Sequence, residues 1–423
     1  MNILVSRSDR AGDLILTLPV FQVLRRDFPS ARILAHVSSY TAPLLDGRPD
    51  VDGVILDDRQ GKPFSFLSLA KKMRKMAIDA AVIVHPSRRA VLGCFMAGIP
   101  IRAGRASNFW MPLLTHRFHQ HRSRNLKHEI AYNLELLEPL EPNELHEPHE
   151  PLELHEPHEL HELPELHEPL ELEPPELHEP LELLEPPELH ELREPSEPSE
   201  TSRSLRFPQS LQSPKPIEID SFAETPHLFS GKESFEWGRH TLMKSGFGGR
   251  PPAFVHPGHG GSAVNLPVFR YRVLVEKLID AGFPVIVTFG PGEAGLEKEF
   301  PPFYPGRLGF VSEIPDLGRL MGLLACGGAF FGGSTGPMHI AAALGIPTVS
   351  FFPLLPAMTP VRWGPSGKLA KVVQPAGIAC PGNCRGCSQG NCLSAVDLEE
   401  SVSWAVLNAI TKQSFTQGLS IRD

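Results

Sequence analysis

Residues 3–27 read ILVSRSDRAGDLILTLPVFQVLRRD, and this stretch decides the fold class. It opens with the short apolar run 3–6, which is typical of a strand buried on both faces. After a turn, apolar side chains recur at helical spacing and predict a helix over residues 14–27, which ends before Pro29. These side chains are Leu14, Leu18, Phe21 and Leu24. A buried strand that leads through a tight turn into a helix is the first unit of a doubly wound α/β sheet.

The same alternation recurs in both halves of the chain. Strands that alternate with helices imply parallel sheets covered on both faces, so we predict two doubly wound parallel-sheet domains of the α/β class. Ligands of such sheets bind at the carboxyl ends of the strands, here in a cleft between the domains. Further strands are expected at residues 33–37, 53–56, 80–84, 253–256, 284–289, 329–331 and 348–352, and helices over 269–281 and 339–344.

A segment of triplets separates the two halves. From Glu138 the chain repeats units that begin with Glu, and after a slip of one residue behind Glu171 the repeat runs on to Glu200. A period of three matches neither helix nor strand but fits polyproline II. Because such a segment cannot bury a core, we expect a disordered insertion over residues 138–215. Its eight His raise the idea of metal binding, but we favour a repeat expansion tolerated on a surface loop.

Length and composition set the remaining boundaries. A chain of 423 residues is long enough for two domains. We expect an N-terminal domain over residues 1–137, a C-terminal domain over 216–396, and a C-terminal helix and tail over 397–423. The opening apolar run is too short for a signal peptide, and no apolar stretch of about 18 residues occurs, so a cytoplasmic protein with at most peripheral membrane contact is expected.

The formal net charge of −9 hides a basic body. Residues 138–200 hold 22 Glu and one Arg, and without them 27 acidic and 39 basic side chains remain, a formal charge of +12. A basic body attracts anionic partners, such as nucleotides, phosphorylated glycolipids or nucleic acid.

The turn RSDRAGD, residues 7–13, offers a carboxylate for chemistry. Gly12 permits a close backbone turn, and Asp13 stands where the helix begins. One interpretation is that Asp13 caps the helix, a common role of Asp. The other is that Asp13 presents its carboxylate to the cleft as a general base. The spacing alone leaves the two interpretations even.

Two glycine-rich turns of the second half are candidate anion sites. The turn HPGHGGSA, residues 256–263, follows a strand, and its glycines can expose N–H groups to a phosphate; a flexible loop is the alternative. The turn GGSTGPMH, residues 332–339, leads into a helix whose N-terminus attracts anions. Ser334 and Thr335 would add hydroxyl donors there, and capping of the helix uses the same positions.

The hexapeptide GPGEAG, residues 290–295, matches the dinucleotide-binding fingerprint and follows a strand. We discount it because an isolated match is weak, Pro291 removes an N–H donor, and Glu293 would repel a pyrophosphate. Glu293 is better suited to accept hydrogen bonds from the hydroxyl groups of a ribose or sugar.

Basic side chains gather before the repeat. A solvated charged face is the ordinary interpretation, and a clamp for the phosphates of an acceptor is the functional one, since Arg forms bidentate contacts. Few aromatic residues lie among these bases, which argues against nucleic acid as a partner. The stretch contains Arg102, Arg105, His116, Arg117, His119, His121, Arg122, Arg124, Lys127 and His128.

Four of the six cysteines lie close together, at Cys380, Cys384, Cys387 and Cys392. In a cytosolic protein such a cluster indicates a structural zinc site before it indicates disulfides. The spacing does not form two CxxC pairs, so uncoordinated thiols are an equal alternative. Cys94 and Cys326 stand in apolar surroundings and are expected in the core.

Taken together, these motifs resemble those of glycosyltransferase family 9, whose best-known members are the ADP-heptose:lipopolysaccharide heptosyltransferases. The first motif is RSDRAGDLILTLP at residues 7–19, with LRRDFP at 24–29. Weaker middle motifs are IRAG at 101–104 and KHEIAYNL at 127–134. The last motifs are HPG at 256–258 and STGPMHIAAALGIPT at 334–348. The resemblance covers nearly the whole chain outside the repeat.

The resemblance implies a GT-B fold, in which two Rossmann-like domains face each other across a cleft. It implies an inverting transfer without a metal or other catalytic cofactor, from a nucleotide-diphospho-sugar, foremost ADP-heptose, to a lipopolysaccharide core or related glycan. Residues 1–137 would bind the anionic glycolipid acceptor at the inner membrane surface, and residues 216–396 would bind the nucleotide-sugar. Asp13 matches the presumed general base of the family.

The expected ligand-binding residues follow from the motifs and the resemblance together. The donor would be held by Gly260, Gly261, Ser262, Glu293, Ser334, Thr335, Gly336 and His339. The acceptor would be held by Arg10, Arg102, Arg105, Arg122, Arg124 and Lys127.

The chain departs from the family pattern at two places. Many members carry Lys and Trp before the Pro at position 267, where this chain has Val264, Asn265 and Leu266, and many carry Asp where it has Ser334. These changes remove one phosphate counter-charge and one carboxylate, so the motifs leave the donor sugar and the base open. Two further hypotheses are an inactive transferase-like protein that acts through its acidic repeat and an NAD-dependent oxidoreductase that uses residues 290–295.

Overall fold

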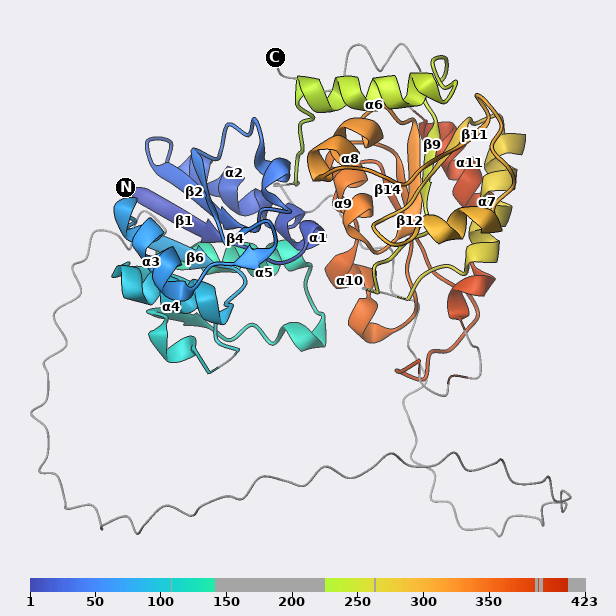
Figure 1. The fold of residues 1–423 in the computed structure, drawn as a ribbon. Coiled ribbons are helices and arrows are strands. Elements are labelled where there is room, and N and C mark those ends of the chain that lie inside the picture. Colours follow the sequence, from blue (N-terminus) through green and yellow to red (C-terminus); the bar gives the residue numbers. More distant parts are fainter. Residues whose placement is uncertain (108, 141–224, 262–263, 385–386, 388–390, 410–423) are drawn as a thin grey trace, which may run out of the picture. The chain divides into compact units, whose positions relative to one another are not determined.

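The computed structural model describes residues 1–107, 109–140, 225–261, 264–384, 387 and 391–409. The triplet repeat from residue 141 on and Ser262 therefore lie outside the described residues. The two halves belong to one compact unit within residues 1–147 and 217–423. Each half forms a six-stranded parallel sheet with helices on both faces (Figure 1), so the prediction of two doubly wound sheets is confirmed.

The first sheet is built around β1, whose residues Ile3, Leu4 and Val5 have no exposed surface. Ile3 pairs with Ile33 on one side and with Ala80 on the other, so the strand order reverses at β1. The order in space is β3 (Gly53–Leu56), β2 (Arg32–Val37), β1 (Asn2–Ser6), β6 (Ala80–Ile83), β7 (Ile101–Arg105) and β8 (His116–Phe118).

Helices cover both faces of this sheet, as the alternation of side chains along a buried strand requires. Ile3 and Val5 point into one apolar cluster with α2 (Leu18–Asp27), while Leu4 points into another with α3 (Phe66–Lys75) and α4 (Arg88–Ala97). The other elements of this half are α1 (Ala11–Ile15), α5 (Glu129–Leu134), the hairpin strands β4 (Asp58–Arg59) and β5 (Lys62–Pro63), and the 3-10 helices η1 (Ala42–Leu45), η2 (Met111–Leu113), η3 (Arg122–Arg124) and η4 (Glu135–Leu140).

The single helix predicted over residues 14–27 is wrong, because the chain forms two helices there. α1 ends at Ile15, and α2 starts at Leu18 with Pro19 in its first turn. Pro19 has no N–H to donate to the preceding turn, so the helix stops and begins again. Asn133 of α5 donates to the Leu16 carbonyl at the break, at 3.0 Å.

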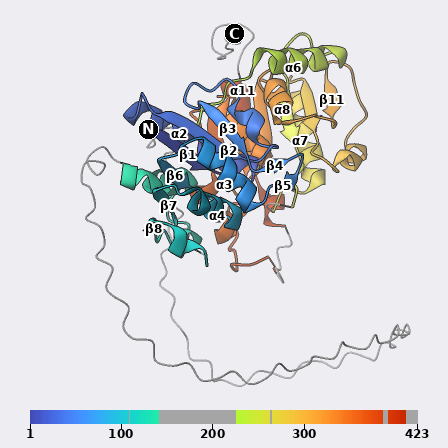
Figure 2. The same ribbon diagram turned by 60° about the vertical axis from the view of Figure 1, so that its left-hand side comes forward.

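The second sheet repeats the design, and several buried phenylalanines lie at its centre. Figure 2 shows the ribbon of both halves turned by 60°. Phe254 and Phe330 face the helices α6 (Lys232–Lys244), α8 (Leu317–Leu324) and α9 (Gly336–Ala343). Phe331 and Phe351 face the helices α7 (Val268–Asp280) and α11 (Leu398–Asn408) on the other side of the sheet. The order in space is β11 (Leu308–Val311), β10 (Val285–Thr288), β9 (Ala253–His256), β12 (Ala329–Gly333), β13 (Thr348–Phe351) and β14 (Ala370–Val373).

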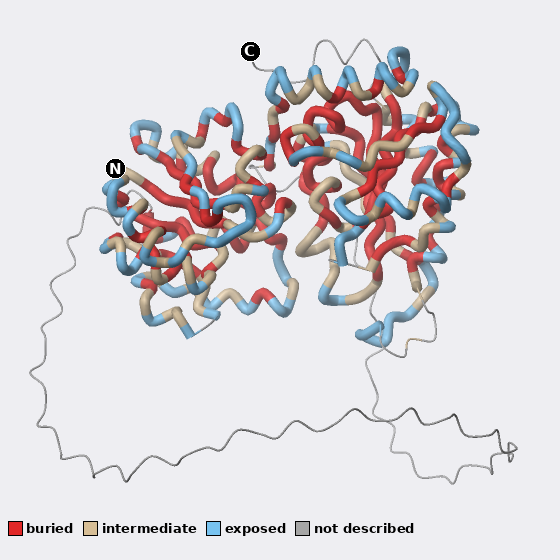
Figure 3. Tube along the Cα trace, viewed as in Figure 1, coloured by how far each residue is buried: buried red, intermediate tan, exposed pale blue. Residues whose placement is uncertain are grey.

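The strands of this half are buried, and of the longer helices residues 232–244, 268–280 and 398–408 keep one face exposed, whereas residues 317–324 and 336–343 are buried nearly all round (Figure 3). The helices of this half are α6 (Lys232–Lys244), α7 (Val268–Asp280), α8 (Leu317–Leu324), α9 (Gly336–Ala343), α10 (Pro360–Trp363) and α11 (Leu398–Asn408), with the 3-10 helices η6 (Ala294–Glu299), η7 (Pro356–Met358) and η8 (Cys392–Ala395). None of the helices in the described part of the chain is both long and apolar enough to span a bilayer.

Candidate functional site

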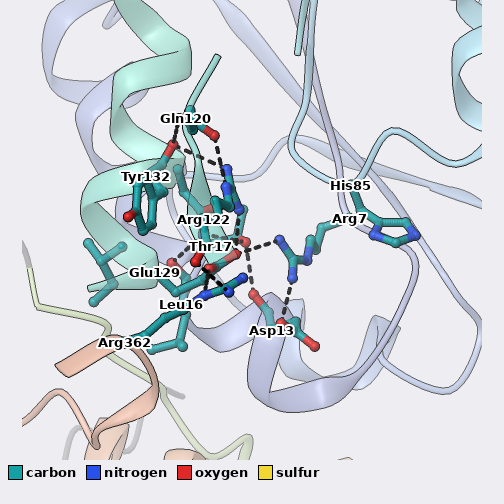
Figure 4. Close-up of polar contacts among 12 residues, drawn as sticks. Arg7, Asp13, Leu16, Thr17, His85, Gln120, Arg122, Glu129, Tyr132 and Arg362 are labelled. Carbon is teal, nitrogen blue, oxygen red and sulfur yellow. Dashed lines mark hydrogen bonds and ion pairs between the residues drawn. The ribbon is translucent and has the colours of Figure 1, made fainter. Parts of the chain in front are cut away.

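Asp13 lies in the first turn of α1, at the carboxyl end of β1. The N-cap of α1 is Arg10, so the interpretation of Asp13 as a helix cap is wrong. Its carboxylate instead accepts a hydrogen bond from Nη2 of Arg7 at 2.5 Å (Figure 4). Only 16% of the Asp13 side chain is exposed. A buried arginine therefore holds this carboxylate in one orientation.

Burial raises the pKa of Asp13 to about 6, and the positive charge of Arg7 opposes that rise. The nearby carboxylates of Asp9 and Glu129 add to it. A general base works best when its pKa lies close to the working pH. Asp13 is thus a stronger base than an exposed aspartate, yet it is still ionised at neutral pH.

A second carboxylate, Glu129 at the start of α5, lies at the centre of three arginines. Arg122 and Arg362 contact it at 2.5 and 3.0 Å, and Nη1 of Arg7 lies 3.5 Å away (Figure 4). Its side chain is 1% exposed. Burial raises the pKa of Glu129, but the three guanidinium groups outweigh burial and lower it below the ordinary value. Glu129 is therefore a buried anion at neutral pH.

Sequence reasoning missed Glu129. Its partners lie at positions 7, 122 and 362, so no local pattern brings them together. The available signal is charge spacing, since Glu129 is the first acidic residue after Asp79 and follows a long basic stretch.

The structure divides the predicted acceptor-binding residues. Arg122 is only 4% exposed, and burial lowers its pKa to about 10 despite Glu129, so it serves the ion cluster. The positive charge of Arg105 interacts with the carboxylate of Glu129. Arg10 is exposed, and its positive charge interacts with the carboxylate of Asp13. The remaining three are engaged or placed elsewhere: Arg102 donates to the Leu113 carbonyl, Lys127 pairs with Glu135, and Arg124 is exposed on η3.

Arg362 of α10 carries this cluster into the second half of the chain. Besides Glu129, it donates to the Arg122 carbonyl at 3.0 Å and to Asn125 at 3.3 Å. Two nearby side chains of the first half contact backbone of the second: His128 meets the Gly364 carbonyl, and Asn125 donates to that of Pro356. The two halves are thus joined by polar contacts beside Asp13.

An apolar contact joins the halves on the other side of Asp13, where α1 packs on α9. A Cβ atom on Gly12 would lie 2.8 Å from Cδ2 of His339, which is shorter than real contacts allow. His339 is 5% exposed, and within the described ranges its Nδ1 has no hydrogen-bond partner. Burial, helped by the nearby His128, lowers the pKa of His339 to about 3, so its ring is neutral.

The N-terminus of α9 follows the end of β12. Its N-cap is Thr335, whose side chain makes no capping hydrogen bond and instead contacts the Gly333 carbonyl at 3.4 Å. The capping interpretation therefore does not hold for the Thr335 side chain. Ser334 and Gly336 are half-buried beside it. The helix dipole and the first-turn N–H groups give this end a partial positive charge.

The glycine-rich loop after β9 is bound to Glu293. Oε1 of Glu293 accepts the N–H groups of His259 and Gly260, both at 3.1 Å, and Oε2 accepts that of Gly290 at 2.9 Å. Gly261 donates its N–H to the His259 ring. A carboxylate thus occupies donors that the sequence assigned to a phosphate. Burial raises the pKa of Glu293, but these N–H groups outweigh it and the pKa lies below its ordinary value.

Glu293 also explains the fingerprint match at residues 290–295. Gly292 has a left-handed φ of 81°, and the chain then enters the 3-10 helix η6. Without an α-helix after the turn, the segment lacks the helix terminus that binds a pyrophosphate in dinucleotide sites.

Asn265, one of the positions that depart from the family pattern, is a buried structural residue. It donates to the Pro257 carbonyl at 2.7 Å and accepts from the hydroxyl of Tyr271 at 2.8 Å. A Cβ on Gly333 would lie 2.3 Å from its Oδ1. Asn265 therefore links the glycine-rich loop to the end of β12.

A Ser-His-Asp arrangement lies at the carboxyl ends of β1, β2 and β3. Ser6 Oγ is 2.8 Å from His36 Nδ1, and His36 Nε2 is 3.2 Å from Asp57. The Ser–His distance is that of a nucleophile and its base, but Ser6 contacts Nδ1 of the ring and not the Nε2 that contacts the nucleophile in a serine-protease triad. All three residues are buried, however, so the arrangement ties the strand ends together and is not open to a substrate.

The four clustered cysteines border one small cavity with Val264, Leu354 and Leu355. Among the described residues no group of three or more His, Cys, Asp or Glu is placed to hold a metal. A structural zinc therefore stays a prediction. Cys94 and Cys326 are buried in the core, as expected.

Comparisons with known proteins give one family match and one relative that aligns along nearly the whole chain. Residues 230–391 match the model of glycosyltransferase family 9 (heptosyltransferase). A Haemophilus influenzae protein named "Putative glycosyltransferase" is 26% identical over 417 residues, which cover 96% of this chain and 99% of that protein.

Solved structures share the fold. Escherichia coli ADP-heptose lipopolysaccharide heptosyltransferase II is 18% identical with a TM-score of 0.63, over 96% of this chain and 99% of that one. Escherichia coli heptosyltransferase WaaC with ADP is 14% identical with a TM-score of 0.56, over 97% of this chain and 100% of that one. The solved structures show the GT-B fold of this chain, and the family match and the full-length relative show a glycosyltransferase that is similar to those of family 9.

Proposed function

We propose that the chain transfers heptose from ADP-heptose, with inversion, to a lipopolysaccharide core or a related glycan. The observation that carries the proposal is the place of Asp13. Its carboxylate, held by Arg7, stands one residue from Gly12, which touches His339 in the first turns of α9. A basic group and an anion-attracting helix end thus meet from the two halves of the chain.

The proposed reaction is a single displacement. Asp13 accepts the proton of an acceptor hydroxyl as its oxygen bonds to the anomeric carbon, and the bond from that carbon to the diphosphate breaks on the opposite face. Arg7 keeps the carboxylate turned toward the acceptor, and Arg10 and Arg105 supply positive charge near it.

Negative charge develops on the leaving diphosphate. We assign its stabilisation to the N-terminus of α9, with Ser334, Thr335 and Gly336, and to the unpartnered Nδ1 of His339 in the described part of the chain. In this proposal these groups take the part that a metal plays in other transferases. Glu293 and the loop with Gly260, Gly261 and Ser262 would hold the nucleoside.

Two features of the relatives support the donor. The family model is that of heptosyltransferases, and a structure that shares this fold is of a heptosyltransferase with ADP. We place the enzyme in the cytoplasm, at the inner membrane surface, where an anionic glycolipid acceptor can be reached. Nucleic acid is not a partner in this proposal.

Calorimetry with ADP-, UDP-, GDP- and CMP-sugars and with NAD tests the donor. We expect selective binding of ADP-heptose. Binding of NAD alone would support the oxidoreductase hypothesis, and absence of all binding would support an inactive protein that acts through its acidic repeat.

The role of Asp13 is tested by Asp13→Asn, with Asp9→Asn as the matched control because Asp9 also pairs with Arg7, at 2.8 Å. Asp13→Asn should bind ADP-heptose normally. Its rate of sugar transfer should be lower by a factor of about 100 or more, which is the usual effect of losing a general base. Asp9→Asn should keep most of its transfer rate. Transfer by Asp13→Asn at the wild-type rate would sink the mechanism.

A further inference from the structure

One face of the first half carries large apolar side chains in the open. On the outer side of α4, Phe95 is 45% and Met96 39% exposed. Beside it, the chain that leads into η2 presents Phe109, which is 86% exposed, and half-buried Trp110. The rings of Phe109 and Trp110 meet edge to face with centroids 5.4 Å apart. We call these four residues the aromatic face.

Part of the aromatic face packs against the hydrophobic core of the first half. Trp110 packs on the apolar cluster between the sheet and helices α3 and α4, together with neighbouring Met111 and Leu113. Leu114, which follows η2, is 2% exposed in the same cluster. The residues next to Phe109 are therefore anchored in the core, while the ring of Phe109 itself is exposed to water. Exposure of so large an apolar surface is unfavourable unless a partner covers it.

Three arginines border the aromatic face. Arg88 lies over the Trp110 ring, and Arg102 over the Phe95 ring, at 5.3 and 5.6 Å from the centroids. Arg102 also donates to the Leu113 carbonyl at 2.7 Å, which joins the two parts of the face. Arg117 donates to the carbonyls of Leu114 and Pro112.

The chain around this face has an unusual charge pattern. Residues 80–128 contain eight Arg and Lys and not one Asp or Glu. Within this segment nothing neutralises the arginines that border the aromatic rings. Exposed Phe109 and half-buried Trp110, bordered by arginines to which this segment supplies no acidic partner, complement a surface that has anionic groups on the outside and apolar chains beneath them.

We propose that the aromatic face docks the enzyme on the surface of an anionic lipid bilayer. Phe109 and Trp110 enter the interface between headgroups and acyl chains, and Arg88, Arg102 and Arg117 contact the anionic headgroups. A single-stranded nucleic acid fits less well, because it needs successive stacking platforms along a groove. The proposal deepens the proposed function and rests on it in one respect, namely that a glycolipid acceptor is reached at a bilayer.

Co-flotation of the full-length chain with lipid vesicles tests the docking surface. We expect binding to phosphatidylcholine vesicles that contain phosphatidylglycerol, weak binding to phosphatidylcholine alone, and weaker binding at high salt. Phe109→Ser should lower the partition constant about tenfold, as expected for loss of one buried aromatic side chain. Arg88→Gln and Arg117→Gln should each lower it about fivefold.

The matched control is Leu407→Ser, because Leu407 of α11 is 84% exposed and far from the basic segment in the sequence. It should bind vesicles like the wild type. The proposal is overturned if the wild type does not bind anionic vesicles, if Leu407→Ser loses as much binding as Phe109→Ser, or if a single-stranded oligonucleotide binds this face in preference to the vesicles.

ADP-heptose binding by the same variants separates this proposal from the proposed function. We expect it to be unchanged by Phe109→Ser. Loss of vesicle binding with normal nucleotide-sugar binding concerns the docking surface alone, whereas absence of nucleotide-sugar binding in every protein, wild type included, concerns only the proposed function.

Discussion

Arg362 of the second half of the chain donates from Nε to Oε2 of Glu129 in the first half, at 3.0 Å. The same carboxylate lies 3.5 Å from Arg7, which in turn binds Asp13 at 2.5 Å. The proposed base and the contact between the two halves therefore share one buried counter-ion. A change at Glu129 should alter both the stability of the protein and the ionisation of Asp13.

Glu129→Gln should lower the free energy of unfolding by about 3 kcal/mol, the usual cost of breaking a buried ion pair. The substitution keeps the shape of the side chain but leaves Arg122 buried without its anion, while Arg7 keeps Asp9 and Asp13. Denaturant unfolding followed by circular dichroism measures the change.

Arg362→Gln is the comparison for that experiment. It removes one of the three cations and leaves Arg7 and Arg122 on Glu129, so about 1 kcal/mol of destabilisation is expected. Equal losses in the two variants would contradict the central place of Glu129.

The pH dependence of transfer should report Asp13. Because a general base must be deprotonated, kcat/KM should fall as the pH drops through about 6, the pKa that burial gives this carboxyl. Arg7→Gln removes a positive charge that lowers the pKa, so the acid limb should move to higher pH.

Glu129→Gln should move the acid limb the other way, since the Glu129 charge raises the pKa of Asp13. Shifts of opposite sign in Arg7→Gln and Glu129→Gln, measured from pH–rate profiles, are the expected result. If the acid limb of the pH–rate profile stayed at the same pH in both variants, it would report the titration of a group other than Asp13.

Gly12→Ala should destabilise the contact between α1 and α9. The new methyl group would lie 2.8 Å from the His339 ring, and forcing an atom into a packed contact costs about 1–3 kcal/mol. His339→Ala removes the obstacle, so in the double variant the Gly12→Ala change should cost much less. A double-mutant cycle by thermal unfolding measures the coupling, and additive losses would speak against the contact.

Glu293→Gln should loosen the glycine-rich loop in a pH-dependent way. The pKa of Glu293 lies below its ordinary value of 4.5, so the folded state favours the carboxylate. Its contribution to stability is complete above that ordinary pKa and is lost as the pH falls through the lower, folded-state value. The stability difference between wild type and Glu293→Gln should thus be largest at neutral pH and shrink in acid. Hydrogen exchange at Gly260 and Gly290 locates the effect.

Much of the fold is visible in local patterns. The apolar runs at residues 33–37 and 253–256 became strands because buried parallel strands need continuous apolar surface on both faces. The break between α1 and α2 was missed although its cause, Pro19, is local, because the apolar spacing continues across it.

The site divides in the same way. The position of Asp13 after the first strand and the turn before α9 are properties of the sequence, since strand–turn–helix order sends both to carboxyl ends of their sheets. The interactions that each side chain makes are not properties of the sequence alone. Whether Asp13 caps a helix or is held by Arg7, and whether Gly260 faces a phosphate or Glu293, depends on neighbours that only folding supplies.

The sequence by itself thus determined two doubly wound sheets and the loops that carry polar groups to their ends, because these follow from periodicity and turn chemistry along the chain. Tertiary structure alone decided that Glu129 collects Arg7, Arg122 and Arg362, and that Gly12 meets His339. The partners Gly12 and His339 stand 327 positions apart in the chain. Burial and charge then act between them through space, where the order of residues carries no signal.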